Sequence, residues 1–299
     1  MIKSEEDKAL PEEYSIKFSY KTLKRLFAEN CYRSRVLHSA SLDKEADSTK
    51  ELSAIFKSAK KLSYSATFIY SILRHKPLKA LPSNLRYDAY TSLKEEYYLY
   101  NYLSRKLLEL SSTYALYSAT LSLYLIPINE ISNLSSYLLA SKKLLAKLKR
   151  SKLFRDLISH YVIKLELCWK HLNKIPHLLL HYHFIFTVDH SKNSSDTANI
   201  IYNLLKKYFN PCISVLVDPI KSITKYTHYI TKSFDNSIFH PKHGYIRPIS
   251  IAIVLSELRN IHPIVISRSL NLSKKRRMIL NDFINSSKID ISQVYLPKS

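Results

Sequence analysis

The chain has 299 residues, with 46 lysines and arginines against 24 aspartates and glutamates, so its formal net charge is +22 at pH 7. This excess favours a polyanionic partner, nucleic acid before an anionic membrane surface, and the length allows a sizeable core in one or two domains. The single glycine excludes a glycine-rich phosphate loop, while the three scattered cysteines support neither a disulfide framework nor a CxxC zinc site.

Three helices are predicted in the first part of the chain, at residues 15–37, 50–75 and 85–110, where apolar side chains recur at helical spacing. The third helix is rich in tyrosine and could stack on nucleic-acid bases. We favour an amphipathic helix that covers a core, because that is the commoner role of such a pattern. We treat residues 1–110 as a helical N-terminal region.

One uncharged stretch, residues 111–129, is long enough to cross a bilayer as a helix. Small polar residues alternate with apolar ones at 114–125, which instead predicts a strand that enters a loop at Pro127. The charged residues at the start of the chain do not resemble a secretory signal peptide. Because the cysteines are also few, we expect a cytoplasmic protein without a membrane partner.

Strands and helices alternate through the middle of the chain. A helix at 129–153 is followed by a strand at 159–169, a turn at 172–175, a strand at 176–189, a helix at 194–209, a short buried strand within 212–220 and a helix at 221–234. With the strand at 114–125, the order β-α-β-β-α-β-α predicts an α+β fold, a mostly antiparallel sheet with helices on one side. Residues 249–258 fit either a helix or a strand.

The strand at 176–189 carries the first candidate site residues. His181 and His183 are two residues apart, so they point to the same side of the strand, and the opposite side is wholly apolar. Glu166 lies on the polar face of the preceding strand, and the short connection predicts a hairpin that brings it near both histidines. Two imidazoles and a carboxylate suit Mg²⁺ or Mn²⁺ at a site that must also bind phosphate oxygens. A His-x-His pair alone is a weak signal among 12 histidines.

The helix at 221–234 carries a candidate nucleophile. Lys225, Tyr229 and Lys232 are spaced i, i+4 and i+7, which puts them on one face, and Tyr226 lies three residues before Tyr229. A tyrosine hydroxyl is a poor nucleophile at its ordinary pKa of about 10. A neighbouring ammonium stabilises the phenolate, and a metal polarises the phosphorus under attack. Together with the histidines, this helix predicts a transesterase that forms a phosphotyrosine.

The motifs in this order resemble a known family. The sequence HYH at 181–183, preceded by LEL at 165–167 and followed by YITK at 229–232, looks like the rolling-circle replication initiators of small plasmids, which belong to the HUH endonuclease superfamily. Residues 119–122 are similar to the first motif of that family. The resemblance covers about residues 114–234 and implies a ferredoxin-like sheet in its replication-initiator version.

The resemblance also implies roles for the site residues. His181 and His183 would bind a divalent metal, Mg²⁺ or Mn²⁺, with Glu166 as the third ligand. Tyr229, or Tyr226 in its place, would attack the scissile phosphate of a plasmid origin and leave a 5′-phosphotyrosyl link and a 3′-hydroxyl primer. Lys232 would position the phosphate or the metal. The implied partners are single-stranded or cruciform origin DNA and the host helicase and polymerase.

We therefore divide the chain into the helical region 1–110, a HUH endonuclease-like domain at 111–236 and a basic extension at 237–299. The four-residue basic cluster at 274–277 either contacts phosphates or forms the solvated start of a helix. Two other functions stay open. The chain could be a non-catalytic, decayed DNA-binding protein of the same family, or a transposase of the HUH superfamily.

Overall fold

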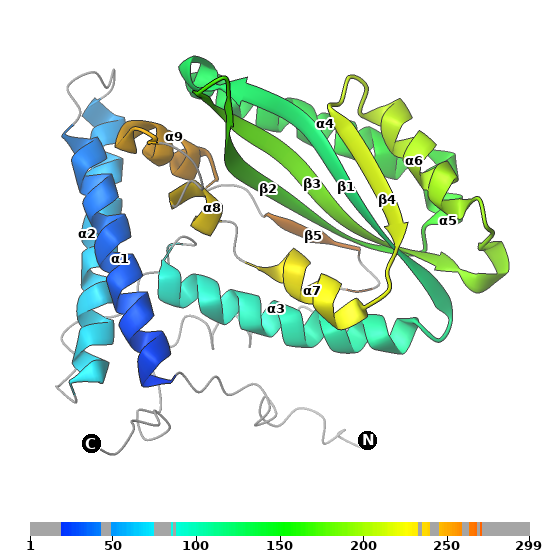
Figure 1. The fold of residues 1–299 in the computed structure, drawn as a ribbon, viewed down its shortest axis with the longest axis horizontal. Helices are drawn as coiled ribbons and strands as arrows, with labels where there is room; N and C mark the ends of the chain where they lie inside the picture. Colours follow the sequence, from blue (N-terminus) through cyan, green and yellow to red (C-terminus); the bar gives the residue numbers. More distant parts are fainter. Residues whose placement is uncertain are drawn as a thin grey trace, which may run out of the picture.

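A five-stranded sheet lies at the centre of the computed structural model (Figure 1). The structure describes residues 19–42, 49–74, 85, 88–232, 235–239, 245–258, 263–267 and 270. Its strands are β1 (Tyr114–Pro127), β2 (His160–Leu172), β3 (Ile175–Asp189), β4 (Ser214–Pro219) and β5 (Ile264–Ile266). Their order across the sheet is β4-β1-β3-β2-β5, and every neighbouring pair is antiparallel. The prediction of an α+β fold with an antiparallel sheet is confirmed.

The predicted hairpin between β2 and β3 is present, and its tight turn fixes the pairing of the two strands. The turn residues Asn173 and Lys174 have φ of 50° and 67°, the left-handed values that a two-residue hairpin turn requires. Asparagine tolerates this conformation better than lysine, which adopts it here in place of the usual glycine. The resulting register sets Glu166 opposite His181, so both side chains share one face of the sheet.

Three helices cover the opposite, apolar face of the sheet, namely α4 (Leu134–Arg150), α5 (Lys152–Leu157) and α6 (Thr197–Tyr208). Because side chains of a strand alternate between faces, every second residue of β3 points toward these helices. The aromatic side chains that β3 buries there are Tyr182, Phe184 and Phe186. This packing forms the main core, on the face of β3 opposite the histidines.

The prediction that helices lie on one side only is wrong. Leu103 of α3 (Ala89–Leu110) and Ile230 of α7 (Ile223–Thr231) pack with Val162 and Ile185 on the histidine face of the sheet. That face is polar around the histidines but apolar at one end, and the apolar end needs a cover. Helices α3 and α7 supply it, which also brings α7 beside the histidines.

The predictions for two other elements need correction. The helix expected at 129–153 is divided into a 3-10 helix, η3 (Ile128–Asn133), followed by α4 and α5, with the Ser151 side chain capping the start of α5. The strand expected to be buried at 212–220 is β4, which lies at the edge of the sheet with Leu216 61% exposed. A short apolar run does not by itself distinguish an edge strand from a central one.

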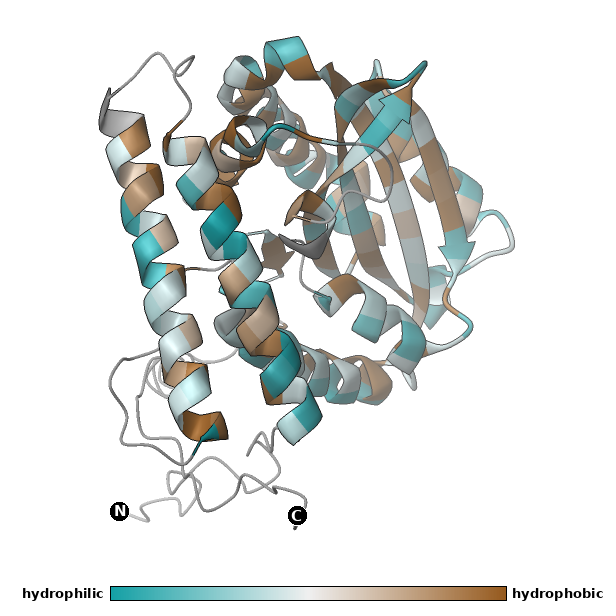
Figure 2. Ribbon diagram, turned by 60° about the vertical axis from the view of Figure 1, so that its left-hand side comes forward, coloured by the Kyte–Doolittle hydropathy of each residue, from teal (hydrophilic) through white to brown (hydrophobic). Residues whose placement is uncertain are grey.

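The N-terminal helices α1 (Tyr20–Ser41) and α2 (Thr49–Leu73) confirm the first two predicted helices. In Figure 2 both helices alternate brown and teal segments, as expected of helices with one buried and one exposed side. Leu37 and Leu62 belong to the same hydrophobic cluster as the sheet, so α1 and α2 pack on the main core. The domain boundaries at residues 110 and 236 stay predictions.

The region after residue 236 adds to both the helices and the sheet. It contains α9 (Pro248–Leu258), which settles the choice between helix and strand there, and β5, which pairs with β2. The short helix α8 (Asp235–Phe239) lies beside the sheet, where Ser237 donates a hydrogen bond to the Leu167 carbonyl. The basic cluster at 274–277 lies outside the described residues.

The uncharged stretch at 111–129 forms β1, as the alternation of its residues predicts. Among the described residues, no helix combines the length and the apolar character that crossing a bilayer requires. A short 3-10 helix, η4 (His190–Lys192), follows β3 and leads the chain toward α6.

Candidate metal centre and nucleophile

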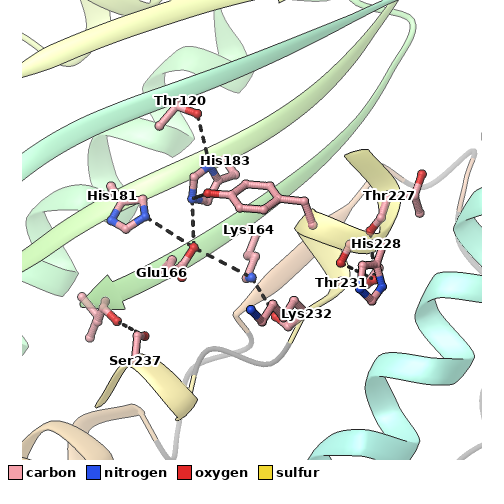
Figure 3. A network of polar contacts seen from close by, with 12 residues as sticks. Thr120, Lys164, Glu166, His181, His183, Thr227, His228, Thr231, Lys232 and Ser237 are labelled. Carbon is pink, nitrogen blue, oxygen red and sulfur yellow. Dashed lines mark hydrogen bonds and ion pairs between the residues drawn. The ribbon is translucent and has the colours of Figure 1, made fainter. Parts of the chain in front are cut away.

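Glu166, His181 and His183 meet on one face of the β2–β3 hairpin (Figure 3). Glu166 Oε2 lies 2.9 Å from His183 Nε2 and 3.4 Å from His181 Nε2. The ligand atoms of the three residues lie within 4.8 Å of one another, and both histidines are buried. The three residues that the sequence nominated as ligands therefore form a group that could hold a metal ion.

The charges of this group balance one another. Burial opposes the charge of Glu166, but hydrogen bonds with His181 and His183 and the charge of Lys164 outweigh it and hold the pKa of Glu166 well below its usual range. Burial also opposes a charged His181, yet interactions with Cys168 and Glu166 raise its pKa to about 9. Burial lowers the pKa of His183. At neutral pH the group thus contains a carboxylate and a protonated imidazole, and a bound cation can take the place of that proton.

Thr120 of β1 holds the other side of His183. Its hydroxyl lies 3.2 Å from His183 Nδ1, and the register of β1 on β3 places the two residues opposite each other. A contact at Nδ1 leaves Nε2 directed at Glu166, which is how neighbouring polar groups orient an imidazole for metal binding. In the sequence, Thr120 drew attention only as part of the segment similar to the first family motif. Its contact with His183 depends on the register of β1 on β3, which the residues alone do not determine.

Tyr229 reaches the same imidazole from α7. Its hydroxyl lies 3.2 Å from His183 Nε2, and its ring stands edge-on to the imidazole with the centroids 4.9 Å apart. Burial, the charge of Glu166 and the Cys168 thiol raise the pKa of Tyr229 above its ordinary value. These side chains by themselves therefore disfavour the phenolate, and positive charge added at Glu166, His181 and His183 would reverse that effect.

No family model, curated protein or solved structure matches the chain. What the site can do therefore follows from its own atoms. Two imidazole nitrogens and one carboxylate oxygen are a mixed donor set that suits a divalent metal, and three protein ligands leave room for oxygens of a substrate. A phenol at the edge of such a group is placed where it could attack a phosphate bound there.

Tyr226, the alternative nucleophile, belongs to the same helix as Tyr229, and its side chain is less exposed. Its hydroxyl donates to the Phe184 carbonyl oxygen at 3.4 Å, and its ring packs against Tyr229 with the centroids 5.9 Å apart. Burial and the neighbouring Tyr229 raise the pKa of Tyr226 to about 12. Of the two tyrosines, the structure brings Tyr229 to the metal-ligand group, while a backbone carbonyl engages Tyr226.

The lysine at the site differs from the one that the sequence selected. Helix α7 ends at Thr231, so Lys232 lies beyond the helix with an exposed side chain and not on the face shared with Tyr229. The Lys232 carbonyl oxygen instead accepts a hydrogen bond of 2.7 Å from Lys164 Nζ. Lys164 is 3% exposed, and its ammonium lies 3.9 Å from Glu166 Oε2. The signal for Lys164 was its position two residues before Glu166, on the same face of β2.

Proposed function

We propose that the chain nicks one strand of DNA by metal-dependent tyrosine transesterification and so initiates rolling-circle replication of a plasmid. The observation that carries this proposal is the contact of 3.2 Å between the Tyr229 hydroxyl and His183 Nε2. It joins a nucleophile to a group of three residues with the donor atoms of a divalent metal site.

The arrangement of the elements supports the same proposal. The chain order β1-α4-β2-β3-α6-β4 is the β-α-β-β-α-β order of ferredoxin-like folds. The resemblance to HUH replication initiators implies this order, with the histidines on a central strand and the tyrosine on a helix that follows. Here β3 carries both histidines, and α7 carries Tyr229.

The proposed reaction exchanges one phosphate ester for another. The Tyr229 oxygen attacks the scissile phosphorus, the bond from phosphorus to O3′ breaks, and the phosphoryl group remains on Tyr229 as a 5′-phosphotyrosyl ester. Overall the phenolic proton ends on O3′, which leaves as a free 3′-hydroxyl. Glu166, His181 and His183 would hold a Mg²⁺ or Mn²⁺ ion, whose positive charge would polarise the phosphorus and favour the phenolate.

The partners follow from the product and from the charge of the chain. A free 3′-hydroxyl is a primer for a host polymerase, and a helicase must separate the strands ahead of it, so both belong to the proposed cytoplasmic reaction. The DNA substrate is an origin in single-stranded or cruciform form, as the resemblance to the replication initiators implies. The net charge of +22 suits such a polyanion.

A nicking assay tests this function. The substrate is supercoiled DNA that carries the coding sequence of the chain and its flanking regions, incubated with Mn²⁺, with Mg²⁺ or with a chelator. We expect relaxed circles only when a metal is present, and Tyr229→Phe should lower the nicking rate by at least about 10⁴-fold. Tyr64→Phe, at a half-exposed tyrosine of α2, is the matched control and should nick normally. Full nicking by Tyr229→Phe would refute the assignment of the nucleophile.

A further inference from the structure

A cleft of about 420 Å³ opens beside Tyr229, between the β4 edge of the sheet and α7. Ser118 of β1 and Asp218 of β4 form its sheet side, and Tyr226 and Tyr229 of α7 contribute two aromatic rings. Lys221 and Lys225 line it as well, together with the backbone that leads into α7. We propose that this cleft binds one unpaired nucleotide of the scissile strand, an assignment that rests on the proposed function and defines its substrate more closely.

Tyr229 connects the cleft to the reacting atoms. Its ring lines the cleft, while its hydroxyl lies 3.2 Å from His183 Nε2 at the metal-ligand group. A strand whose phosphate meets that hydroxyl must therefore place a neighbouring nucleotide along the ring. The Tyr226 ring packs against the Tyr229 ring, and its hydroxyl donates a hydrogen bond to the Phe184 carbonyl. The two rings form a preorganised wall for contact with a base.

The charges that line the cleft favour one orientation of the bound nucleotide. Lys221 lies just before α7 and Lys225 in its first turn, and both side chains are exposed. The N-terminal end of a helix adds partial positive charge, so the phosphate is favoured on this side. Asp218 lines the cleft from β4 and repels a phosphate, but its carboxylate can accept a hydrogen bond from an exocyclic amino group. The base therefore points toward β4, and a cytosine suits the cleft better than a thymine.

Binding of a short fluorescent single strand of mixed sequence tests the assignment. The intact chain is measured in a chelator, so that no reaction contributes to the signal. Lys221→Ala/Lys225→Ala should weaken binding by at least about tenfold and lower the slope of log affinity against log salt by about 1.4. The charge-matched control is Lys142→Ala/Lys143→Ala, which replaces two exposed lysines of α4 on the opposite face of the sheet. Its affinity for the strand should fall much less.

Two outcomes would overturn the cleft assignment. One is unchanged affinity in Lys221→Ala/Lys225→Ala, and the other is an equal loss for a duplex of the same sequence, since the lysines would then be general phosphate contacts. The binding measurement does not depend on which residue is the nucleophile, because no reaction occurs in the chelator. If the unaltered chain nicks DNA normally and Lys221→Ala/Lys225→Ala binds the strand as tightly as the unaltered chain, the cleft assignment is wrong and the proposed function stands. If the cleft binds the strand but no metal-dependent nicking occurs, the proposed function is wrong and the cleft assignment stands.

The direction of the base has its own test. The affinity for an all-cytosine strand should exceed that for an all-thymine strand, and Asp218→Ala should bring the ratio close to one, because the exposed Asp218 side chain supplies the acceptor. If the ratio is the same in Asp218→Ala and in the unaltered chain, the base does not point toward β4.

Discussion

His183 shows how much of the site depends on single side chains. Its Nδ1 faces the Thr120 hydroxyl, and its Nε2 faces both Glu166 and Tyr229. One imidazole thus links β1, β2 and α7, three elements that are far apart in the sequence. The candidate metal ligand His183 therefore contacts both the hydroxyl that orients it and the proposed nucleophile.

Lys164 contacts both the Glu166 carboxylate and the Lys232 carbonyl just beyond α7. Its replacement should therefore change metal affinity and nicking in opposite directions. Lys164→Met removes a positive charge 3.9 Å from Glu166 Oε2, so the affinity for Mn²⁺ should rise by up to about tenfold. The same change removes the hydrogen bond to the Lys232 carbonyl just beyond α7, so nicking should fall. Calorimetry measures the first effect and single-turnover nicking the second.

Lys164→Arg is the matched variant, because it keeps the charge and should keep Mn²⁺ affinity near that of the unaltered chain. A loss of Mn²⁺ affinity in Lys164→Met would contradict the electrostatic argument. Unchanged nicking in Lys164→Met would show that the contact with the Lys232 carbonyl does not position α7.

Metal binding should depend on pH through His181. Burial lowers the pKa of His181, but Cys168 and Glu166 outweigh burial and raise it to about 9. Below that pH a metal must displace the proton, so the apparent Mn²⁺ affinity should rise by up to about tenfold per unit between about pH 6 and about pH 8. Titrations of the metal by electron paramagnetic resonance would measure this slope. A flat affinity across the range would show that His181 does not exchange a proton for the metal.

At the scale of elements, β3 has one face for the core and one for the site. Phe184 is fully buried beneath the helices of the apolar face, next to His183 on the other side. Phe184→Ala should lower the free energy of unfolding by about 3–5 kcal/mol, because it leaves a cavity in the main core. Leu216→Ala on the exposed edge strand β4 should cost less than about 0.5 kcal/mol. Urea unfolding compares the two, and similar costs would contradict the edge position of β4.

Much of this element order could be predicted from the sequence, because periodicity is a local property. The alternation in residues 159–189 indicated both strands of the hairpin, and the spacing of His181 and His183 indicated their common face. The edge position of β4 and the packing of α7 on the sheet depend on contacts between distant segments, which periodicity does not contain. For the same reason the sequence selected Lys232 on a helix predicted too long, passed over Lys164 and included Thr120 only through the first-motif resemblance.

At the scale of the whole molecule, the N-terminal helices are attached to the sheet through α8. The Tyr32 hydroxyl of α1 donates to the Phe239 carbonyl, and the Trp169 indole of β2 donates to the Ile238 carbonyl. The site therefore lies on a sheet that packing stabilises from both faces, as preorganised chemistry requires. The excess of positive charge is a property of the whole chain and suits a long polyanion.

Identification of the covalent product is the most direct test of DNA nicking by Tyr229. Supercoiled DNA carrying the coding and flanking sequences is incubated with the chain and Mn²⁺, the DNA is digested, and the modified peptide is identified by mass spectrometry. We expect a nucleotide joined through its 5′-phosphate to Tyr229, and a nicked strand whose 3′-hydroxyl a polymerase extends. Metal-dependent nicks without a protein adduct, or an adduct on another residue such as Tyr226, would contradict it.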